Sequence, residues 1–425
     1  MTYRFLFGEK ILRVQKFGLL LLQVFCLASP ISPTFAASPE LDLRPQVKLA
    51  VKAALSDDVQ KTPNAALAKL DEAGGLPDLT EQESFVLARA RVSVLAEARE
   101  YTSLVHALQL ILASPLVPEH EKASYESALV AAFSGAGQYA QLVERMSANI
   151  LAGSDPQMYS ALVGALYKTG DFKTAAEVQL KFLKSPFGAT DAQQWEQWAM
   201  LAGSCKRADE RGCYIDALER MVSLKYSQVV LLETLNRISQ DQRGDRVQVE
   251  VYRLKQKVAP LAAVELLDFG RLLLRDGAAS EAHTLIESAF KTGKLGKGED
   301  APRQERLRAI VARDYAEARS RPPMTDQYKS TRPITLVADA AHDLVQAGQS
   351  GKGIEMLEYA IGSGELRDIG AARLHLALAY SGIGRQQDAL AQLGSIPAED
   401  SLAPIGRLWS AYLLRPTPPG RPGSP

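Results

Sequence analysis

Apolar residues recur every three or four positions along most of the chain, which is the spacing of amphipathic helices. The clearest example is the stretch 159–186, where two apolar stripes flank a turn at Gly170 and Asp171. A glycine can adopt the positive φ that ends one helix, and an aspartate can cap the next helix. Pro186 then closes the unit. The pattern predicts two short helices joined by a tight turn.

Six turns of this kind divide the chain. In each of them a glycine follows an amphipathic stretch, and these glycines are Gly137, Gly170, Gly244, Gly277, Gly348 and Gly384. The intervals between them are 33, 74, 33, 71 and 36 residues, so that the two long intervals each hold about two periods. A single helix pair cannot bury both of its apolar faces, and a run of pairs therefore predicts an array in which neighbouring pairs cover one another.

Helix pairs at this period are typical of the tetratricopeptide repeat (TPR) family, which the chain resembles over residues 43–414. Small residues where the two helices of a pair would cross support the resemblance, namely Gly270 with Ala282 and Ala377 with Ala389. The unit around Gly170 departs from the family pattern, because Val163 stands where a small residue is usual. The resemblance implies an all-α fold, a right-handed α-solenoid of roughly nine TPR-like helix-turn-helix units. This array is expected to occupy residues 37–414.

The first 36 residues have the pattern of an export signal. Basic residues precede an apolar run of 12 residues at 17–28, which is short for a bilayer span and suitable for a signal peptide. Thr34 and Ala36 place small residues three and one positions before the expected cleavage site, which follows Ala36. We therefore expect a periplasmic mature chain. The alternative is an uncleaved signal that anchors the protein in the inner membrane; no later apolar segment is expected to span a membrane.

Charge excludes one class of partner. Lys+Arg and Asp+Glu balance at 49 each, and the first 36 residues hold four basic and one acidic residue, 4 − 1 = +3, which leaves −3 for the remainder. A slightly acidic chain argues against nucleic-acid binding. The sequence RPTPPGRPGSP at 415–425 predicts a disordered Pro-rich tail.

Two cysteines, Cys205 and Cys213, remain once the signal peptide is removed. An even pair in an oxidising compartment predicts a disulfide, and the spacing excludes a CxxC metal site. The pair brackets residues 206–212, which we expect to form an enlarged turn between two helices. Free buried thiols are the alternative.

The sequence offers no constellation of catalytic residues. The stretch 348–353 resembles a phosphate loop only briefly, since no Ser or Thr follows Lys352, and it is better explained as a repeat turn. None of the five histidines forms a metal-binding motif such as HExxH. We therefore expect no enzyme, no nucleotide, no cofactor and no metal.

The resemblance implies that inward-facing positions of the first helices line a concave groove for an extended peptide or a partner helix. By register these positions are Arg89, Tyr167, Lys168, Arg271, Arg275 and His342. Arg271 and Arg275 are four residues apart and share one helix face, where they could meet a carboxylate group. Glu265 and Asp268 lie near enough on the same helix to pair with them instead. The alternative for each position is a solvated helix face without a ligand.

The chain is also similar to exported TPR proteins of Gram-negative bacteria that have no established activity. We therefore expect a periplasmic scaffold that binds a protein or peptide segment of an envelope complex through its concave face. Two alternatives stay open: a structural accessory of an export or energy-transducing envelope system, and an enzyme whose site the sequence hides. The identity of the partner does not follow from the sequence.

Overall fold

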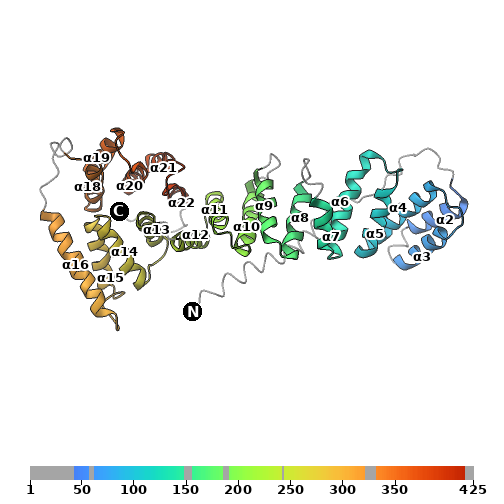
Figure 1. The fold of residues 1–425 in the computed structure, drawn as a ribbon, viewed down its shortest axis with the longest axis horizontal. Helices are drawn as coiled ribbons and strands as arrows, with labels where there is room; N and C mark the ends of the chain where they lie inside the picture. Colours follow the sequence, from blue (N-terminus) through green and yellow to red (C-terminus); the bar gives the residue numbers. More distant parts are fainter. Residues whose placement is uncertain are drawn as a thin grey trace. The chain divides into compact units, whose positions relative to one another are not determined.

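A computed structural model describes residues 43–56, 62–147, 156–184, 191–241, 244–320 and 332–416 of the 425-residue chain. Over these ranges it contains 20 α-helices and no strand (Figure 1), which confirms the all-α prediction for them. None of the described helices has both the length and the apolar character that crossing a membrane requires. The expected signal peptide, 1–36, lies outside the described residues, as does the expected tail apart from Arg415 and Pro416.

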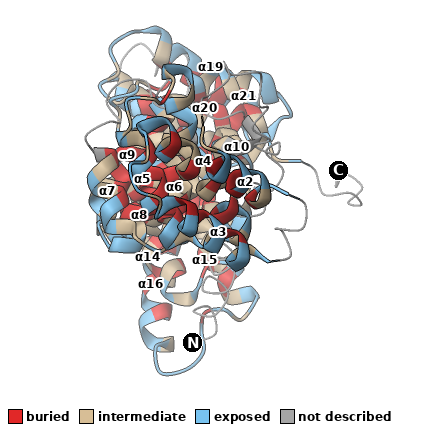
Figure 2. Cartoon of the chain, turned by 90° about the vertical axis from the view of Figure 1, so that its right-hand side faces the viewer, coloured by how far each residue is buried: buried red, intermediate tan, exposed pale blue. Residues whose placement is uncertain are grey.

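The chain forms two compact units, Met1–Ala136 and Gly137–Pro425. The helices of the first unit are α2 (Pro45–Ala54), α3 (Pro63–Gly74), α4 (Glu81–Ala98), α5 (Tyr101–Ala113) and α6 (Glu119–Gly135). Each of these helices contacts the next one, and α2 also contacts α4. Successive pairs therefore stack, and the buried residues lie between the helices while exposed residues occupy the outer faces (Figure 2).

A buried carboxylate in α4 binds the segment that precedes α2. Glu83 in the first turn of α4 is only 1 % exposed, and Arg44 just before α2 donates hydrogen bonds to it from Nε at 2.9 Å and from Nη2 at 2.8 Å. Glu83 also forms a capping box with Thr80. Hydrogen bonds from the side chain and the backbone N–H of Arg44 lower the pKa of Glu83 to about 2. The contact joins segments that are 39 residues apart.

The second unit contains fifteen of the described helices. They are α7 (Tyr139–Ser147), α8 (Pro156–Thr169), α9 (Phe172–Lys184), α10 (Asp191–Arg207), α11 (Arg211–Leu224), α12 (Gln228–Gln240), α13 (Asp245–Val258), α14 (Ala263–Arg275), α15 (Ala279–Lys291), α16 (Ala301–Ser320), α18 (Ile334–Gln346), α19 (Ser350–Gly362), α20 (Ile369–Gly382), α21 (Gln386–Gly394) and α22 (Ala403–Leu413). From α7 to α16 and from α18 to α22, every helix contacts its successor.

The turn glycines behave as the sequence predicts. All six have a positive φ, between 69° and 93°. Three further turns place a residue with a side chain in the same left-handed conformation: Asp78 between α3 and α4 (φ 53°), Arg99 between α4 and α5 (φ 57°) and Asp209 between α10 and α11 (φ 55°). Asp209 divides the 74-residue interval into 209 − 170 = 39 and 244 − 209 = 35 residues. The interval from Gly277 to Gly348 differs, because its midpoint falls inside the continuous helix α16.

Two of the small residues at helix crossings lie close to the partner helix. A Cβ atom on Gly270 would lie 2.9 Å from Cδ1 of Ile286, so the Ile286 side chain would have to move. A Cβ atom on Gly353 would lie 2.7 Å from the carbonyl oxygen of Ala341, which belongs to the preceding helix. The tight crossings inferred from the sequence are therefore present in both pairs.

The later part of the second unit closes on itself. Helix α22 contacts α11 and α13, and α18 contacts α15, so that α11–α16 and α18–α22 form a ring of helices (Figure 1). One hydrophobic core runs through both halves of this ring and includes Leu231, Val251 and Leu254 together with Leu376 and Trp409. The ring differs from the open array that the repeat pattern predicts, because the apolar faces of α11–α13 are covered by the end of the chain.

Candidate functional site

Six ionisable side chains from four helices and one turn meet inside the ring. They are Glu250 and Arg253 of α13, Asp276 of the α14–α15 turn, Glu281 of α15, His342 of α18 and His375 of α20. We refer to them as the ionic cluster.

Arg253 is the centre of the ionic cluster and is 3 % exposed. Its Nη2 lies 2.8 Å from Oε2 of Glu281 and 3.3 Å from Oδ2 of Asp276. Its Nη1 pairs with Glu250, one turn back on the same helix, and lies 3.1 Å from Nε2 of His375. The guanidinium therefore joins α13 to α15 and α20.

The two histidines of the ionic cluster are stacked on each other. Their ring centroids are 3.7 Å apart, and the planes differ by 24°. Nε2 of His375 lies 2.9 Å from Oε1 of Glu250. His342 has its nearest carboxylate oxygen, on Glu281, at 3.8 Å, which is too long for a hydrogen bond, and neither of its ring nitrogens has a hydrogen-bond partner.

Burial and charge act against each other on the two glutamates. Burial alone would raise the pKa of Glu250 and of Glu281, but Arg253 together with the neighbouring histidines outweighs it and brings both pKa values to about 2. Burial lowers the pKa of His342 to about 3, with His375 and Arg253 acting in the same direction. At neutral pH His342 is therefore uncharged, and the single positive charge of Arg253 lies between the two ionised glutamates.

These contacts give the ionic cluster a structural role. Within the described residues, no set of three His, Cys, Asp or Glu side chains is arranged to hold a metal ion. Every partner of Arg253 comes from another part of the ring or from its own helix, so the cluster holds distant helices together. Removing one partner of such a buried ion pair strongly destabilises the folded protein.

The prediction that His342 lines a groove is wrong. The sequence places it on the inner side of an open array, where it would line a groove. In the structure it is 4 % exposed, because α20 folds back over α18 and stacks His375 on it. His342 therefore belongs to the interior of the ring and does not line an open surface.

The two arginines of α14 do not have the partners expected from their helix. Nη1 of Arg275 lies 2.7 Å from Oδ2 of Asp245, at the start of α13. Glu265 pairs instead with Lys255, and the hydroxyl of Tyr252 donates to Asp268 at 3.0 Å. The interpretation that Glu265 and Asp268 engage the arginines is therefore wrong.

Arg89 lies in the first unit, on α4. Its Nη2 is 3.3 Å from Oε2 of Glu121 on α6, and its guanidinium lies 5.7 Å from the ring centroid of Phe85. The side chain is 37 % exposed. Arg89 thus already has an acidic partner within its own unit.

Tyr167 and Lys168 lie at the end of α8, beside a cation that the sequence did not single out. The rings of Tyr167 and Phe172 meet edge to face at 5.0 Å. The guanidinium of Arg207, the last residue of α10, lies 5.6 Å from the Tyr167 ring centroid and 5.4 Å from that of Phe172. Lys168 and Arg207 are both exposed.

Among the described residues, no carboxylate lies within ion-pair distance of Lys168 or Arg207. A guanidinium that lies beside aromatic rings is a frequent component of binding surfaces. Nothing near Arg207 in the sequence indicates this contact, since its two aromatic partners lie 40 and 35 residues earlier, on α8 and on α9 (207 − 167 and 207 − 172).

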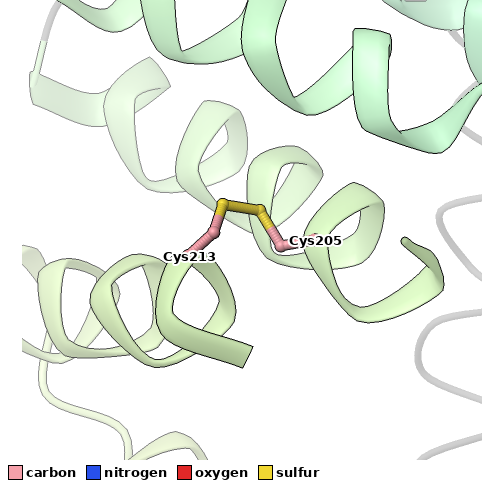
Figure 3. The surroundings of a disulfide bond; sticks show 2 residues. All are labelled: Cys205 and Cys213. Carbon is pink, nitrogen blue, oxygen red and sulfur yellow. A yellow bond between two sulfur atoms is a disulfide. The ribbon is translucent and has the colours of Figure 1, made fainter. Parts of the chain in front are cut away.

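A disulfide joins Cys205 to Cys213 (Figure 3), with the two Cα atoms 5.7 Å apart. It links the end of α10 to the start of α11. The turn between them is shorter than the sequence suggests, because α10 extends to Arg207 and α11 begins at Arg211. Cys205 is fully buried in a core that includes Leu201 and Met221.

A pocket of about 330 Å³ lies beside this disulfide, between α10, α11 and α12. Its lining includes Cys205, Lys206, Tyr214, Ile215 and Arg237. Burial raises the pKa of the Tyr214 hydroxyl, which donates a hydrogen bond to Glu233 at 3.2 Å. The phenol is therefore neutral, and the pocket offers both apolar and polar contacts.

Consecutive helix pairs, left-handed turn residues and small residues at the crossings are all present. The fold is TPR-like. No family model matches the chain, and no curated protein matches it in sequence.

Three solved structures align with most of the chain. The structure of Naa15/Naa10 bound to HypK-THB aligns at 13 % identity over 84 % of this chain and 59 % of that chain, with a TM-score of 0.39. The APC/C hetero-tetramer Cut9-Hcn1 aligns at 12 % identity over 86 % and 62 %, with a TM-score of 0.21. The P58(IPK) TPR domain aligns at 14 % identity over 87 % and 98 %, with a TM-score of 0.20. Since every TM-score is below 0.5, the fold assignment rests on this chain's own geometry.

Proposed function

We propose that the protein is a non-catalytic scaffold, exported to the periplasm, that binds a segment of a partner protein in the cell envelope. The observation that carries the proposal is the exposed guanidinium of Arg207, held across the rings of Tyr167 and Phe172 without an acidic partner among the described residues. Arg and Tyr are the side chains that contribute most energy to protein interfaces when a partner buries them.

The repeat architecture supports a binding role for this region. Stacked helix pairs leave long surfaces whose side chains do not pack in the core. Inside the ring such a surface is occupied, because α18–α22 cover α11–α13. Among the described residues of their own unit, nothing comparable covers the ends of α8 and α10 or the start of α9, and Lys168 and Arg207 stay exposed there.

The experiment is crosslinking in cells with a photoreactive amino acid at position 168. We expect a defined crosslinked protein, identified by mass spectrometry, when the reactive group lies next to Tyr167. Position 181, an exposed site further along α9, is the matched control and should give no such product. The proposal is contradicted if position 168 gives no crosslinked product, or if positions 168 and 181 give the same product in equal amounts.

A further inference from the structure

The turns α8–α9 and α10–α11 carry an excess of positive charge. Residues 167–173 and 206–211 contain five basic side chains (Lys168, Lys173, Lys206, Arg207, Arg211) and three acidic ones (Asp171, Asp209, Glu210), which gives 5 − 3 = +2. This differs from the acidic balance of the chain beyond its first 36 residues. We name Tyr167, Lys168, Phe172, Lys173 and Arg207 the basic turn surface.

Local contacts already occupy two of the three acidic side chains. Oδ1 of Asp171 accepts a hydrogen bond from the backbone N–H of Thr174 at 3.1 Å and so caps α9. Oδ1 of Asp209 lies 4.0 Å from Nε of Arg211, in its own turn. Lys168, Lys173 and Arg207, by contrast, have no ion-pair partner among the described residues. The positive charge of the basic turn surface is thus available to a ligand.

Arg207 is the best placed of these cations. Two rings hold its guanidinium, so a partner would not have to order a free side chain before binding it, which reduces the entropic cost. A planar guanidinium can also donate two parallel hydrogen bonds to one carboxylate.

We infer that the basic turn surface binds an acidic segment of a partner protein, with Arg207 as the residue that recognises a carboxylate. This inference rests on the proposed function and adds the chemistry of the partner. The warrant is charge complementarity: a surface with unpaired cations and a stacked arginine favours a peptide that carries Asp or Glu side chains. Fixing the guanidinium on two rings favours arginine over lysine at this position.

The test measures binding of fluorescein-labelled deca-glutamate to the whole mature chain by fluorescence anisotropy, with deca-glutamine as the neutral probe. We expect saturable binding of deca-glutamate only, which weakens as salt rises. Arg207→Glu should weaken this binding about tenfold or more, because it reverses the charge in a specific contact. Arg207→Lys should weaken it about threefold, because the ring contacts and the planar fork are lost.

Lys181→Glu is the matched control, since it changes the charge by the same amount. Lys181 is exposed on α9, about 13 Å along the helix from Phe172. It should alter binding by less than about twofold. Equal losses for Arg207→Glu and Lys181→Glu, or no binding of deca-glutamate, would overturn the inference. Circular dichroism of each variant checks that the helices are intact.

Two further outcomes separate this inference from the proposed function. If a partner crosslinks at position 168 but deca-glutamate does not bind, the inference of an acidic ligand is wrong and the proposed scaffold function still holds. Binding of anionic phospholipid vesicles with the same loss for Arg207→Glu, in the absence of peptide binding, assigns the surface to a membrane and overturns the inference.

Discussion

The imidazole rings of His342 and His375 are stacked 3.7 Å apart, although the two residues belong to different helix pairs. The stack lies against Arg253, Glu250 and Glu281 and is part of the contact between α13–α15 and α18–α20. Closure of the ring therefore depends on groups that titrate, and the stability of the second unit should depend on pH.

The first prediction concerns acid. The pKa of His342 is about 3 in the folded protein, below its usual 6.5, because burial disfavours the charged ring. Between these two values the unfolded chain binds more protons than the folded one, so stability falls as pH falls below about 6.5. The loss at pH 5 should be about 2 kcal/mol from this group, measured by urea unfolding.

His342→Phe keeps an aromatic ring against His375 and removes the titrating group, so its stability should be nearly level between pH 7 and pH 5. His106→Phe, at an exposed histidine of the first unit, should keep the pH dependence. The depressed pKa values of Glu250 and Glu281, about 2, add a separate loss only below about pH 4.5. If the stability of His342→Phe falls between pH 7 and pH 5 as steeply as that of the unchanged protein, another group is responsible for the pH dependence.

The second prediction concerns the centre of the ionic cluster. Arg253→Met leaves Glu250 and Glu281 buried without a counter-charge and should destabilise the second unit by about 3–5 kcal/mol. Combining it with Glu250→Gln and Glu281→Gln removes the uncompensated charges and should restore part of this loss. The urea midpoints of the single and triple variants measure this recovery. A triple variant that is no more stable than the single variant contradicts the electrostatic explanation.

The third prediction is the disulfide. Thiol labelling of the denatured, unreduced mature chain should find no free thiol at Cys205 or Cys213. Replacing both by Ser should lower stability by about 2.5 kcal/mol on the chain-entropy model for so short a loop. Two labelled thiols per chain would show that the bond is absent in the isolated protein.

The fourth prediction uses the turn at Asp209. Its φ of 55° suits glycine better than a residue with a Cβ atom, so Asp209→Gly should stabilise the protein by about 0.5–1 kcal/mol. Gly277→Ala is the reciprocal change: its Cβ would meet no atom within 4 Å, so the cost of about 1 kcal/mol comes from φ alone. Thermal unfolding should shift up for the first variant and down for the second.

The fifth prediction concerns export. We expect the protein from a periplasmic extract to begin at Ala37, after removal of residues 1–36. Edman sequencing or intact mass gives the N-terminus directly. A chain that retains Met1 and fractionates with the inner membrane supports the uncleaved anchor instead.

The sequence predicted the helix pairs well because their signals are local. Gly170, Gly244 and Gly384 each mark a turn through their own backbone conformation, which needs no knowledge of the rest of the chain. The turns at Arg99 and Asp209 carry no glycine signal, because a residue with a side chain takes the left-handed position there; the turn at Asp209 was predicted from the cysteine pair that brackets it.

The candidate site was less predictable, because its contacts are made between distant helices. The register placed His342 on an inner face correctly, but nothing near it in the sequence indicates that His375 covers it. Arg253 looks like an ordinary surface charge in the sequence, yet it is buried inside the ring. Arg207 acquires its importance from two rings on an earlier helix pair.

Closure of the ring also has a consequence for the order in which the chain can fold. Arg407 of α22 pairs with Glu219 of α11, 188 residues earlier, so this contact forms only after α22 has been made. Contacts between neighbouring helices form quickly, whereas bringing such distant segments together is slow. Until then the apolar faces of α11 and α13 lack their cover, and a chain truncated before α22 is expected to aggregate. Helix α22 therefore makes the solubility of the second unit depend on synthesis through residue 413.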